Sequence, residues 1–369
     1  MRPCVGGARF VALLILLASP CSTFDGCDQD PTHTPFSVHA SVHRAHLPLC
    51  KEQEHTQGFW EIPRIHSCGG GLKKDFVCCD ARTNAPAIDG LCPAIRGFGA
   101  LSSFNGTLGL SNPFQEGCQC GGLLDIDPWE LYKWYPHDCQ LLHFNASSFC
   151  EVLGPRTILF VGDSLVSQSM QTLTSLLAVS GGKCVTQMLY AQSVFLSRAV
   201  GDDYGSVAKA VRDMRPSILV MNSGAHVASN DQLRDSLQRV HAGLEQLAAE
   251  GIAPQVFWMT QVPGHVNCLA HSAPFSSYAH FRHHTLETLS ADRYRWSQFA
   301  EFDNSSVAFA RERGWHVLDV SPLQLRPDGH VGMRHSKALD CLHFCVPGPL
   351  NLVAELVHHL LLTGQMGHI

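Results

Sequence analysis

From residue 156 onward, short apolar runs alternate with longer stretches in which apolar residues recur with the period of a helix. The short runs predict strands at 157–161, 185–190, 217–222, 255–260 and 315–320. The longer stretches predict helices at 164–179, 204–214, 231–249, 292–313 and 349–363. Strands that alternate with helices form parallel sheets covered on both faces. The pattern therefore predicts an α/β fold, a doubly wound parallel sheet in an αβα sandwich, with ligands at the carboxyl ends of its strands.

The first strand-to-helix turn combines a buried strand with polar residues. The run Ile158 to Val161 is continuous and apolar, and the apolar residues after Ser164 recur on one helix face. A serine at such a turn has its amide in the first helical turn, where the dipole favours a developing anion. Ser164 is therefore a candidate nucleophile. The alternative is a simple helix cap, because Asp and Ser are both common there, and Val166 departs from the G-x-S-x-G elbow.

The far end of the chain favours the catalytic interpretation. Asp340 and His343 supply a carboxylate and an imidazole three residues apart, in the order Ser, Asp, His. That spacing can place the carboxylate against one ring nitrogen while the other ring nitrogen faces Ser164. Histidine suits the role of base because its ordinary pKa lies close to neutral pH.

Polar residues also follow the other predicted strands. An Asn at the end of strand 217–222, Asn222, can offer its side-chain amide to an oxyanion, and Gly224 allows close approach of the backbone. The alternative is an ordinary Asn-Ser-Gly turn. Thr260 to His265 and Arg326 to His330 follow two later strands, so several polar segments are expected at one edge of the sheet.

The chain before the α/β region divides into three parts. Residues 1–22 have two arginines before the apolar run Phe10 to Ala18, which is typical of a cleaved signal peptide. A short signal-anchor, with membrane association through the N-terminus, is the alternative. Residues 23–115 are rich in Cys, His and Pro and predict loop-rich structure. Residues 116–155 form an aromatic segment that precedes the predicted catalytic domain, 156–369.

Cysteines and glycosylation sequons indicate the secretory pathway. The chain has 16 cysteines, and cleavage of the signal would remove Cys4 and Cys21 and leave an even number suited to disulfides. Sequons at Asn105, Asn145 and Asn304 agree with that compartment. The expected location is the Golgi lumen or membrane, or the extracellular space.

Charge and ligand patterns exclude several classes of function. The formal net charge is −6 and no long basic run occurs, which argues against a nucleic-acid partner. Histidines at 33, 39, 43 and 46 suggest a metal site, but no C-x-x-C or H-E-x-x-H pattern accompanies them. Solvated loop histidines are the favoured interpretation, and no metal or other cofactor is predicted.

Four aromatic residues stand close together in the segment 116–155, namely Trp129, Tyr132, Trp134 and Tyr135. They could stack on sugar rings, or they could pack this segment against the next domain. Packing is the favoured interpretation, since large aromatic side chains are mostly buried.

The motifs together resemble those of a known family. Gly162-Asp163-Ser164, with the segment Asp340 to Gly348, is similar to the paired GDS and D-C-x-H-W-C-x-P-G motifs of the PC-esterase / trichome-birefringence-like family, a branch of the SGNH (GDSL-like) hydrolase fold. Trp134 to Phe144, Thr260 to Cys268 and Arg326 to His330 also resemble family segments, so the similarity spans about residues 116–363.

This resemblance implies a Ser164, His343 and Asp340 triad and an oxyanion hole formed by the Ser164 amide, Asn222 and Gly224. It implies supporting roles for residues of the matching motifs: Gly162, Asp163, Gln168, His265, Arg326, Asp328 and His330. It makes Cys268 a plausible partner for Cys341, and Cys118 or Cys120 for Cys345. Cys139 is a further disulfide candidate, and disulfides on both sides of His343 would fix the loop that carries it.

Family members O-acetylate cell-wall polysaccharides, and related ones act on other glycans or as esterases. The resemblance therefore implies an O-acetyltransferase whose partners are a polysaccharide acceptor and an acetyl donor. An esterase with the same triad and a non-catalytic glycan-binding protein are the alternatives. This chain departs from the family pattern at Ser167, where an Arg is usual, and at Gln261, Gly264 and Phe344. These departures leave the substrate open.

Overall fold

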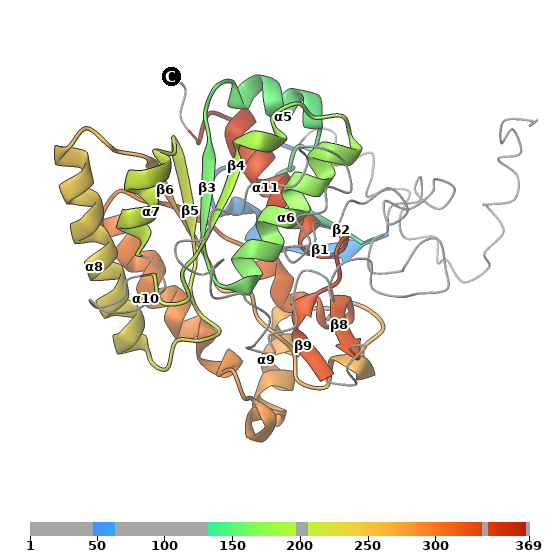
Figure 1. The fold of residues 1–369 in the computed structure, drawn as a ribbon. Coiled ribbons are helices and arrows are strands. Elements are labelled where there is room, and N and C mark those ends of the chain that lie inside the picture. Colours follow the sequence, from blue (N-terminus) through green and yellow to red (C-terminus); the bar gives the residue numbers. More distant parts are fainter. Residues whose placement is uncertain (1–46, 63–131, 197–205, 334–338, 367–369) are drawn as a thin grey trace, which may run out of the picture.

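The computed structural model describes residues 47–62, 132–196, 206–333 and 339–366 (Figure 1). All structural statements below concern these residues. Several sequence predictions lie outside them: the signal segment 1–22, the histidines at 33, 39, 43 and 46, and the residues Asn105, Cys118, Cys120 and Trp129.

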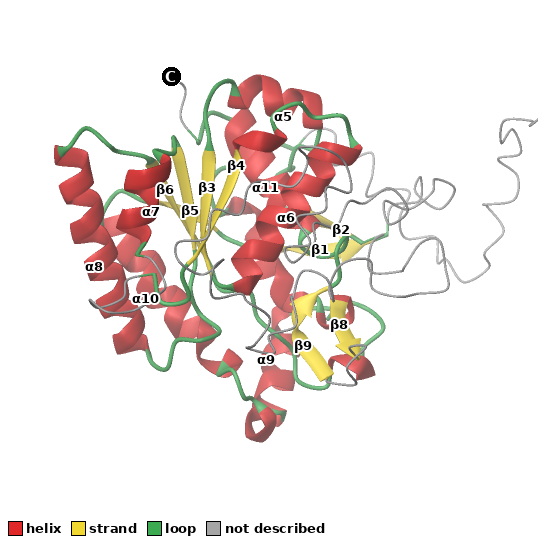
Figure 2. Ribbon diagram, in the orientation of Figure 1, coloured by secondary structure: helices red, strands yellow, loops and turns green. Residues whose placement is uncertain are grey.

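A parallel five-stranded sheet forms the centre of the molecule (Figure 2). Its strands are β3 (Ile158–Gly162), β4 (Met188–Gln192), β5 (Ile218–Met221), β6 (Gln255–Met259) and β7 (His316–Leu318), in the order β4-β3-β5-β6-β7. All neighbouring pairs are parallel. The predicted fold class is thus confirmed. The prediction for the second strand began three residues early, because Val185–Gln187 form a 3₁₀ turn.

Helices cover both faces of this sheet. On one face α6 (Ser164–Val179) packs on β3 and β4, α11 (Asn351–Leu362) packs on α6, and α5 (Ala146–Leu153) packs on α11. On the other face α8 (Asn230–Ala249) packs between α7 (Val207–Met214) and α10 (Phe299–Glu312). Figure 1 shows these two groups of helices on opposite sides of the strands.

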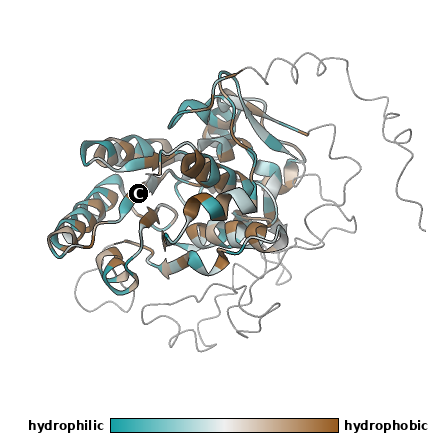
Figure 3. Ribbon diagram, turned by 90° about the horizontal axis from the view of Figure 1, so that it is seen from above, coloured by the Kyte–Doolittle hydropathy of each residue, from teal (hydrophilic) through white to brown (hydrophobic). Residues whose placement is uncertain are grey.

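Apolar periodicity explains why these helices form. In α8 the five predicted core positions, Leu233, Leu237, Val240, Leu244 and Leu247, are all buried. Burial of each such side chain stabilises the fold by about 1.5–3 kcal/mol. In Figure 3 the peripheral helices contain both hydrophilic and hydrophobic residues, as expected for helices with one solvated face. The N-cap of α8 is Ser229, whose hydroxyl accepts the Gln232 N–H.

Two helices depart from the sequence prediction. The long helix expected at 292–313 begins only at Phe299, since Asp292 to Ser297 form a turn and a short 3₁₀ segment. A further helix, α9 (Tyr278–Glu287), was not predicted. It lies beside the hairpin of β8 (His330–Met333) and β9 (Leu339–Phe344) at one end of the molecule (Figure 1).

The described N-terminal segment pairs with the aromatic segment. Strand β1 (Gly58–Glu61) is antiparallel to β2 (Lys133–Pro136), and the Cys50–Cys139 disulfide joins the same two segments. Trp134 is buried and its indole N–H donates to the His55 carbonyl at 2.7 Å. For Trp134, the packing interpretation therefore holds over sugar stacking.

Three disulfides and two exposed sequon asparagines agree with the expected secretory pathway. Besides Cys50–Cys139, bonds join Cys150 to Cys184 and Cys268 to Cys341. Asn145 and Asn304 are exposed, and the Asn145 side chain caps α5 by accepting the Ser148 N–H. Within the described ranges, no helix combines the length and the apolar character that crossing a membrane requires.

Candidate active site

Three side chains from distant parts of the chain meet at the carboxyl edge of the sheet. Ser164 Oγ lies 2.7 Å from Nε2 of His343, and Nδ1 of His343 lies 2.8 Å from an Asp340 carboxylate oxygen. Ser164 follows β3, whereas Asp340 and His343 are both on β9. Strands β4 and β5, which follow β3 in the chain, lie on opposite sides of it in the sheet. Ser164 therefore stands at a topological switch point, the place where α/β sheets bind ligands.

The hydrogen bonds fix the form of the imidazole. A carboxylate only accepts, so Nδ1 of His343 carries the proton and Nε2 of the neutral ring is free to accept from the Ser164 hydroxyl. The other Asp340 oxygen accepts the backbone N–H groups of Leu342 and His343, each at 3.0 Å. Asp340 and His343 are both buried. This arrangement can draw a proton from Ser164 and stabilise the imidazolium that results.

Local sequence explains how Ser164 is presented. Asp163 caps α6 by accepting the Leu165 N–H at 3.0 Å, so Ser164 is the first helical residue. A side chain at Gly162 would overlap Val166 and the Asn222 carbonyl, which explains the glycine. Burial raises the pKa of the Asp163 carboxyl, and the nearby His226 and His343 imidazoles partly counter that effect.

Sequence reasoning missed the contribution of Tyr190. Its buried hydroxyl lies 3.1 Å from the carbonyl oxygens of both Gly162 and Asp163. Burial raises the pKa of this phenol, so it remains a donor. Tyr190 is the last residue of the predicted strand 185–190. Its place in the strand predicted directly after the helix that follows Ser164 was the available signal.

Gln168 connects the nucleophile helix to the strand that carries the base. Its amide nitrogen donates to the Phe344 carbonyl at 3.1 Å, and its amide oxygen accepts the Phe344 N–H at 3.2 Å. Gln168 is fully buried. Because Phe344 follows His343 directly, this pair of bonds fixes the main chain beside the imidazole.

Two buried histidines contact the main chain of His343. Nδ1 of His330 lies 3.2 Å from the His343 carbonyl oxygen, and Nε2 of His330 lies 2.7 Å from Nδ1 of His265. Nε2 of His265 lies 2.9 Å from the Gln324 carbonyl oxygen. Burial lowers the pKa of His330 to about 4 and that of His265 well below its ordinary value. The pair therefore holds the backbone of β9 through the His343 carbonyl.

Arg326 and Asp328 form a buried ion pair. Two guanidinium nitrogens lie 2.9 Å from the two Asp328 oxygens. The guanidinium also lies over the Trp60 ring, 4.5 Å from its centroid, and 5.0 Å from that of Tyr132. This pair joins the N-terminal segment to the loop before β8.

The side chain of Asn222, predicted for an oxyanion hole, contacts the main chain of the neighbouring strand. Its amide nitrogen donates to the main-chain carbonyls of Met259 at 2.8 Å and Thr260 at 3.2 Å. These contacts join the end of β5 to the end of β6, and the role of the Asn222 amide in an oxyanion hole stays a prediction. At Gly224 a side chain would overlap the amide of Gln261, so the backbone does approach closely there. The Ser164 amide, also predicted for this role, lies in the first turn of α6, where backbone N–H groups lack intrahelical partners.

A disulfide anchors the strand that bears Asp340 and His343. Cys341 bonds to Cys268 in the loop after β6, and the Cys341 carbonyl accepts the His265 N–H at 3.0 Å. Cys345 is also disulfide-bonded, and the cysteines predicted as its partner, Cys118 and Cys120, lie outside the described residues. Across the described ranges, no group of three His, Cys, Asp or Glu side chains is arranged to hold a metal ion.

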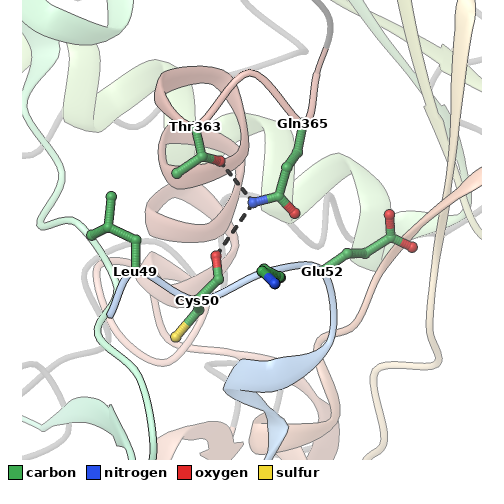
Figure 4. Close-up of a pocket in the computed structure, with 6 residues that line it drawn as sticks. Leu49, Cys50, Glu52, Thr363 and Gln365 are labelled. Atoms are coloured by element: carbon green, nitrogen blue, oxygen red, sulfur yellow. Dashed lines mark hydrogen bonds between the residues drawn. The ribbon is translucent and has the colours of Figure 1, made fainter. Parts of the chain in front are cut away.

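A hollow of about 540 Å³ lies elsewhere, lined by Leu49 to Glu52, Thr363 and Gln365. In Figure 4 the Gln365 amide bonds to the Thr363 hydroxyl and the Cys50 carbonyl. The Gln365 carbonyl also accepts from Gln255, the first residue of β6. The hollow therefore belongs to the amino edge of the sheet, opposite the edge that carries Ser164.

The sequence is similar to a known protein family over its C-terminal part. A family model described as PC-Esterase, a GDSL/SGNH-like acyl-esterase family found in Pmr5 and Cas1p, matches residues 214–360. The predicted resemblance to the PC-esterase family is confirmed. The matched segment contains Asp340 and His343, whereas Ser164 precedes it.

Several plant proteins of this PC-esterase group are similar to the chain. Probable xylan O-acetyltransferase 11 of Oryza sativa subsp. japonica is 31% identical over 119 residues, which cover 31% of this chain and 29% of that protein. Xylan O-acetyltransferase 2 of the same rice is 24% identical over 313 residues, covering 63% of this chain and 60% of that protein. The chain therefore matches less than two thirds of the length of these relatives. A crystal structure of the acetyl xylan esterase AlAXEase aligns with a TM-score of 0.33 at 12% identity, covering 54% of this chain and 97% of that one.

Proposed function

We propose that this PC-esterase relative is an O-acetyltransferase of the secretory pathway, which acetylates hydroxyl groups of a polysaccharide through an acyl-Ser164 intermediate. The observation that carries the proposal is the continuous line of hydrogen bonds from Ser164 Oγ through His343 to Asp340, with distances of 2.7 and 2.8 Å. Such a line is what a serine needs to act as a nucleophile at neutral pH.

In the first half of the proposed reaction, Ser164 Oγ attacks the carbonyl carbon of an acetyl ester or thioester donor. Nε2 of His343 takes the hydroxyl proton, and the Ser164 amide donates to the oxyanion of the tetrahedral intermediate. When the intermediate collapses, the bond to the donor breaks and the leaving alcohol or thiol takes the proton from His343. The product of this half-reaction is acetyl-Ser164.

In the second half, a hydroxyl of the acceptor attacks acetyl-Ser164. His343 takes the acceptor proton and returns it to Ser164 Oγ as the acyl bond breaks. Asp340 holds the imidazole in the required tautomer through both halves. The acetyl group ends on the acceptor as an ester, and the enzyme returns to its starting state.

The acceptor class is inferred from chemistry and similarity. The relatives named as xylan O-acetyltransferases support a polysaccharide acceptor. Disulfides persist in oxidising compartments, so the bonds at Cys50, Cys150 and Cys268 support a location in the secretory pathway.

Mass spectrometry of the intact protein tests this proposal. We expect wild type to gain one acetyl group at Ser164 when mixed with an aryl acetate, and to lose it faster when an acceptor oligosaccharide is added. Ser164→Ala should not gain the group, and His343→Ala should lower the transfer rate by about 10³-fold or more. Ser180→Ala, at the other end of the same helix, is the matched control and should behave as wild type.

The outcomes separate the functions. Loss of the acetyl group at the same rate with and without sugars would identify an esterase that uses water as acceptor. A folded wild type that never becomes acetylated would refute the nucleophile assignment. Near-normal transfer by folded Ser164→Ala or His343→Ala would do the same.

A further inference from the structure

A rigid turn precedes α10 at the carboxyl edge of the sheet. One carboxylate oxygen of Asp292 accepts the Trp296 N–H, and the other accepts the N–H and the hydroxyl of Ser297, all at 2.9 Å. Arg295 adopts a left-handed backbone conformation, with φ of 58°. These contacts determine where the two aromatic side chains of the turn, Tyr294 and Trp296, can lie.

The two rings form a stacked pair with unequal exposure. Their centroids are 5.6 Å apart and their planes differ by 22°. Trp296 is 8% exposed, whereas Tyr294 is 37% exposed. The buried indole thus supports a phenol ring that remains accessible. An accessible ring backed by a fixed one is a preorganised surface for a flat ligand.

This pair lies beside the loops that form the candidate active site. The Trp296 indole occupies the space where a side chain of Gly264 would project, and the Cys341 carbonyl borders the same space. Cys341 stands between Asp340 and His343 in β9. The Arg295 guanidinium donates to the Val227 carbonyl at 2.8 and 3.1 Å, in the loop that follows β5. The turn therefore touches two of the loops that meet near Ser164.

The contact with Gly264 explains one departure of this chain from the family pattern. Gly264 is one of the positions at which this chain departs from the motifs it resembles. A side chain at position 264 and the Trp296 indole cannot occupy the same space. Gly264 and Trp296 therefore act as a pair: the glycine makes room for the indole that supports Tyr294.

We propose that Tyr294, supported by Trp296, is a subsite that stacks against a pyranose ring of the acceptor glycan. A pyranose ring presents a face of C–H groups to an aromatic ring, while its hydroxyls point outward at the edge. The exposed phenol suits that face, and the position beside β9 would bring a neighbouring sugar of the same chain toward Ser164. This inference rests on the proposed function, since it names a site for the acceptor of that reaction.

Direct binding tests the subsite without turnover. In a Ser164→Ala background, xylo-, gluco- and manno-hexasaccharides are titrated by calorimetry and by Trp fluorescence. Tyr294→Ala in that background should weaken binding of the preferred glycan by about tenfold. Tyr294→Phe keeps the ring and should remain within about twofold. Leu289→Ala removes an exposed apolar side chain (47% exposed) from the preceding 3₁₀ turn and should leave binding unchanged.

Each outcome decides the inference. Equal glycan affinity with and without the Tyr294 ring, in proteins with matching circular dichroism, would overturn the subsite, as would the absence of binding by any of the three glycans. Loss of affinity in Tyr294→Ala, retained in Tyr294→Phe, supports it. If wild type also fails to form acetyl-Ser164, the subsite stands and the proposed reaction fails, so the two results remain distinct.

Discussion

At the scale of single residues, Gln168 is expected to position the base. Its amide satisfies both main-chain groups of Phe344, the residue after His343. Gln168→Leu should leave these buried groups unpaired, lower the free energy of unfolding by about 1–3 kcal/mol and lower kcat by about 10-fold or more, because His343 is held less firmly. The acceptor KM should change little. Steady-state kinetics and urea unfolding measure these effects.

Thr172→Val is the matched control for Gln168. It removes a buried hydrogen bond, 2.8 Å long, from the same helix without touching β9. It should lower stability by a similar amount and leave kcat close to wild type. Equal losses of kcat in the two variants would show that Gln168 acts only through stability.

Residue types predicted which side chains meet at Ser164 better than they predicted the contacts around them. Ser164, Asp340 and His343 were recognisable because a strand-to-helix turn and a three-residue spacing are local features of the sequence. The Asn222 amide was assigned to an oxyanion because it stands at a strand end. The carbonyls it contacts in the structure, those of Met259 and Thr260, lie 37 and 38 residues further along the chain. Local sequence carries no information on which of two uses such an amide will have.

At the scale of elements, the Cys268–Cys341 disulfide is expected to matter for catalysis and for stability. It holds β9 to the loop after β6, next to Asp340. Replacing both cysteines by serine should lower the free energy of unfolding by about 2–4 kcal/mol and lower kcat by about 10-fold, because β9 loses a fixed point beside the triad. Kinetics on the folded double variant, below its unfolding temperature, measures the second effect.

The Cys150–Cys184 disulfide supplies the comparison, because it joins α5 to the segment before β4. The loops closed by the two bonds span 34 and 73 residues, so chain entropy makes their contributions to stability differ by only about 0.7 kcal/mol. The corresponding double variant should be destabilised to a similar degree and retain its kcat. A fall in kcat of the same size would show that the disulfide near the triad has no specific role.

The periodicity of apolar residues predicted the helices that bury one apolar face. It missed the elements whose structure depends on polar contacts. Helix α9 was missed because Phe281 is the residue it buries, so no apolar stripe marks it. The hairpin β8–β9 was missed because His330, Asp340 and His343 occupy buried positions where a strand pattern calls for apolar residues. The turn at Asp292 interrupted a predicted helix through side-chain bonds that sequence spacing does not reveal.

At the scale of the whole molecule, polar contacts fix residues 47–62 to the α/β domain. Glu52 accepts the Val317 N–H at 2.9 Å, His55 lies 2.7 Å from the Asp319 carbonyl oxygen, and His359 lies 2.7 Å from the Cys50 carbonyl oxygen. The composition of residues 23–115 predicted loops, and it could not reveal these contacts with residues more than 250 positions away. A segment that lacks periodicity can still be fixed in place by individual polar bonds.

Acid should destabilise the molecule through its buried histidines, and His358 allows a clean test. Its ring is buried between Phe144 and Phe149, and burial lowers its pKa to about 4. An unfolded histidine titrates near 6.5. Between these values the unfolded chain binds a proton that the folded chain does not, so stability falls as the pH falls from about 6.5 toward 4. For His358 the loss amounts to at most about 3 kcal/mol.

The carboxyls of Asp163, Asp303 and Glu355 act in the opposite sense, because desolvation raises their pKa values. Their contribution cancels when wild type is compared with His358→Gln, since both proteins contain them. Urea unfolding at a series of pH values from 7 to 4 should show stability falling more steeply for wild type than for His358→Gln, with the gap growing toward acid. If the two plots of stability against pH were parallel, the ring of His358 would be solvated or protonated in the folded protein. The packing of α11 against α5 would then tolerate a charged imidazole.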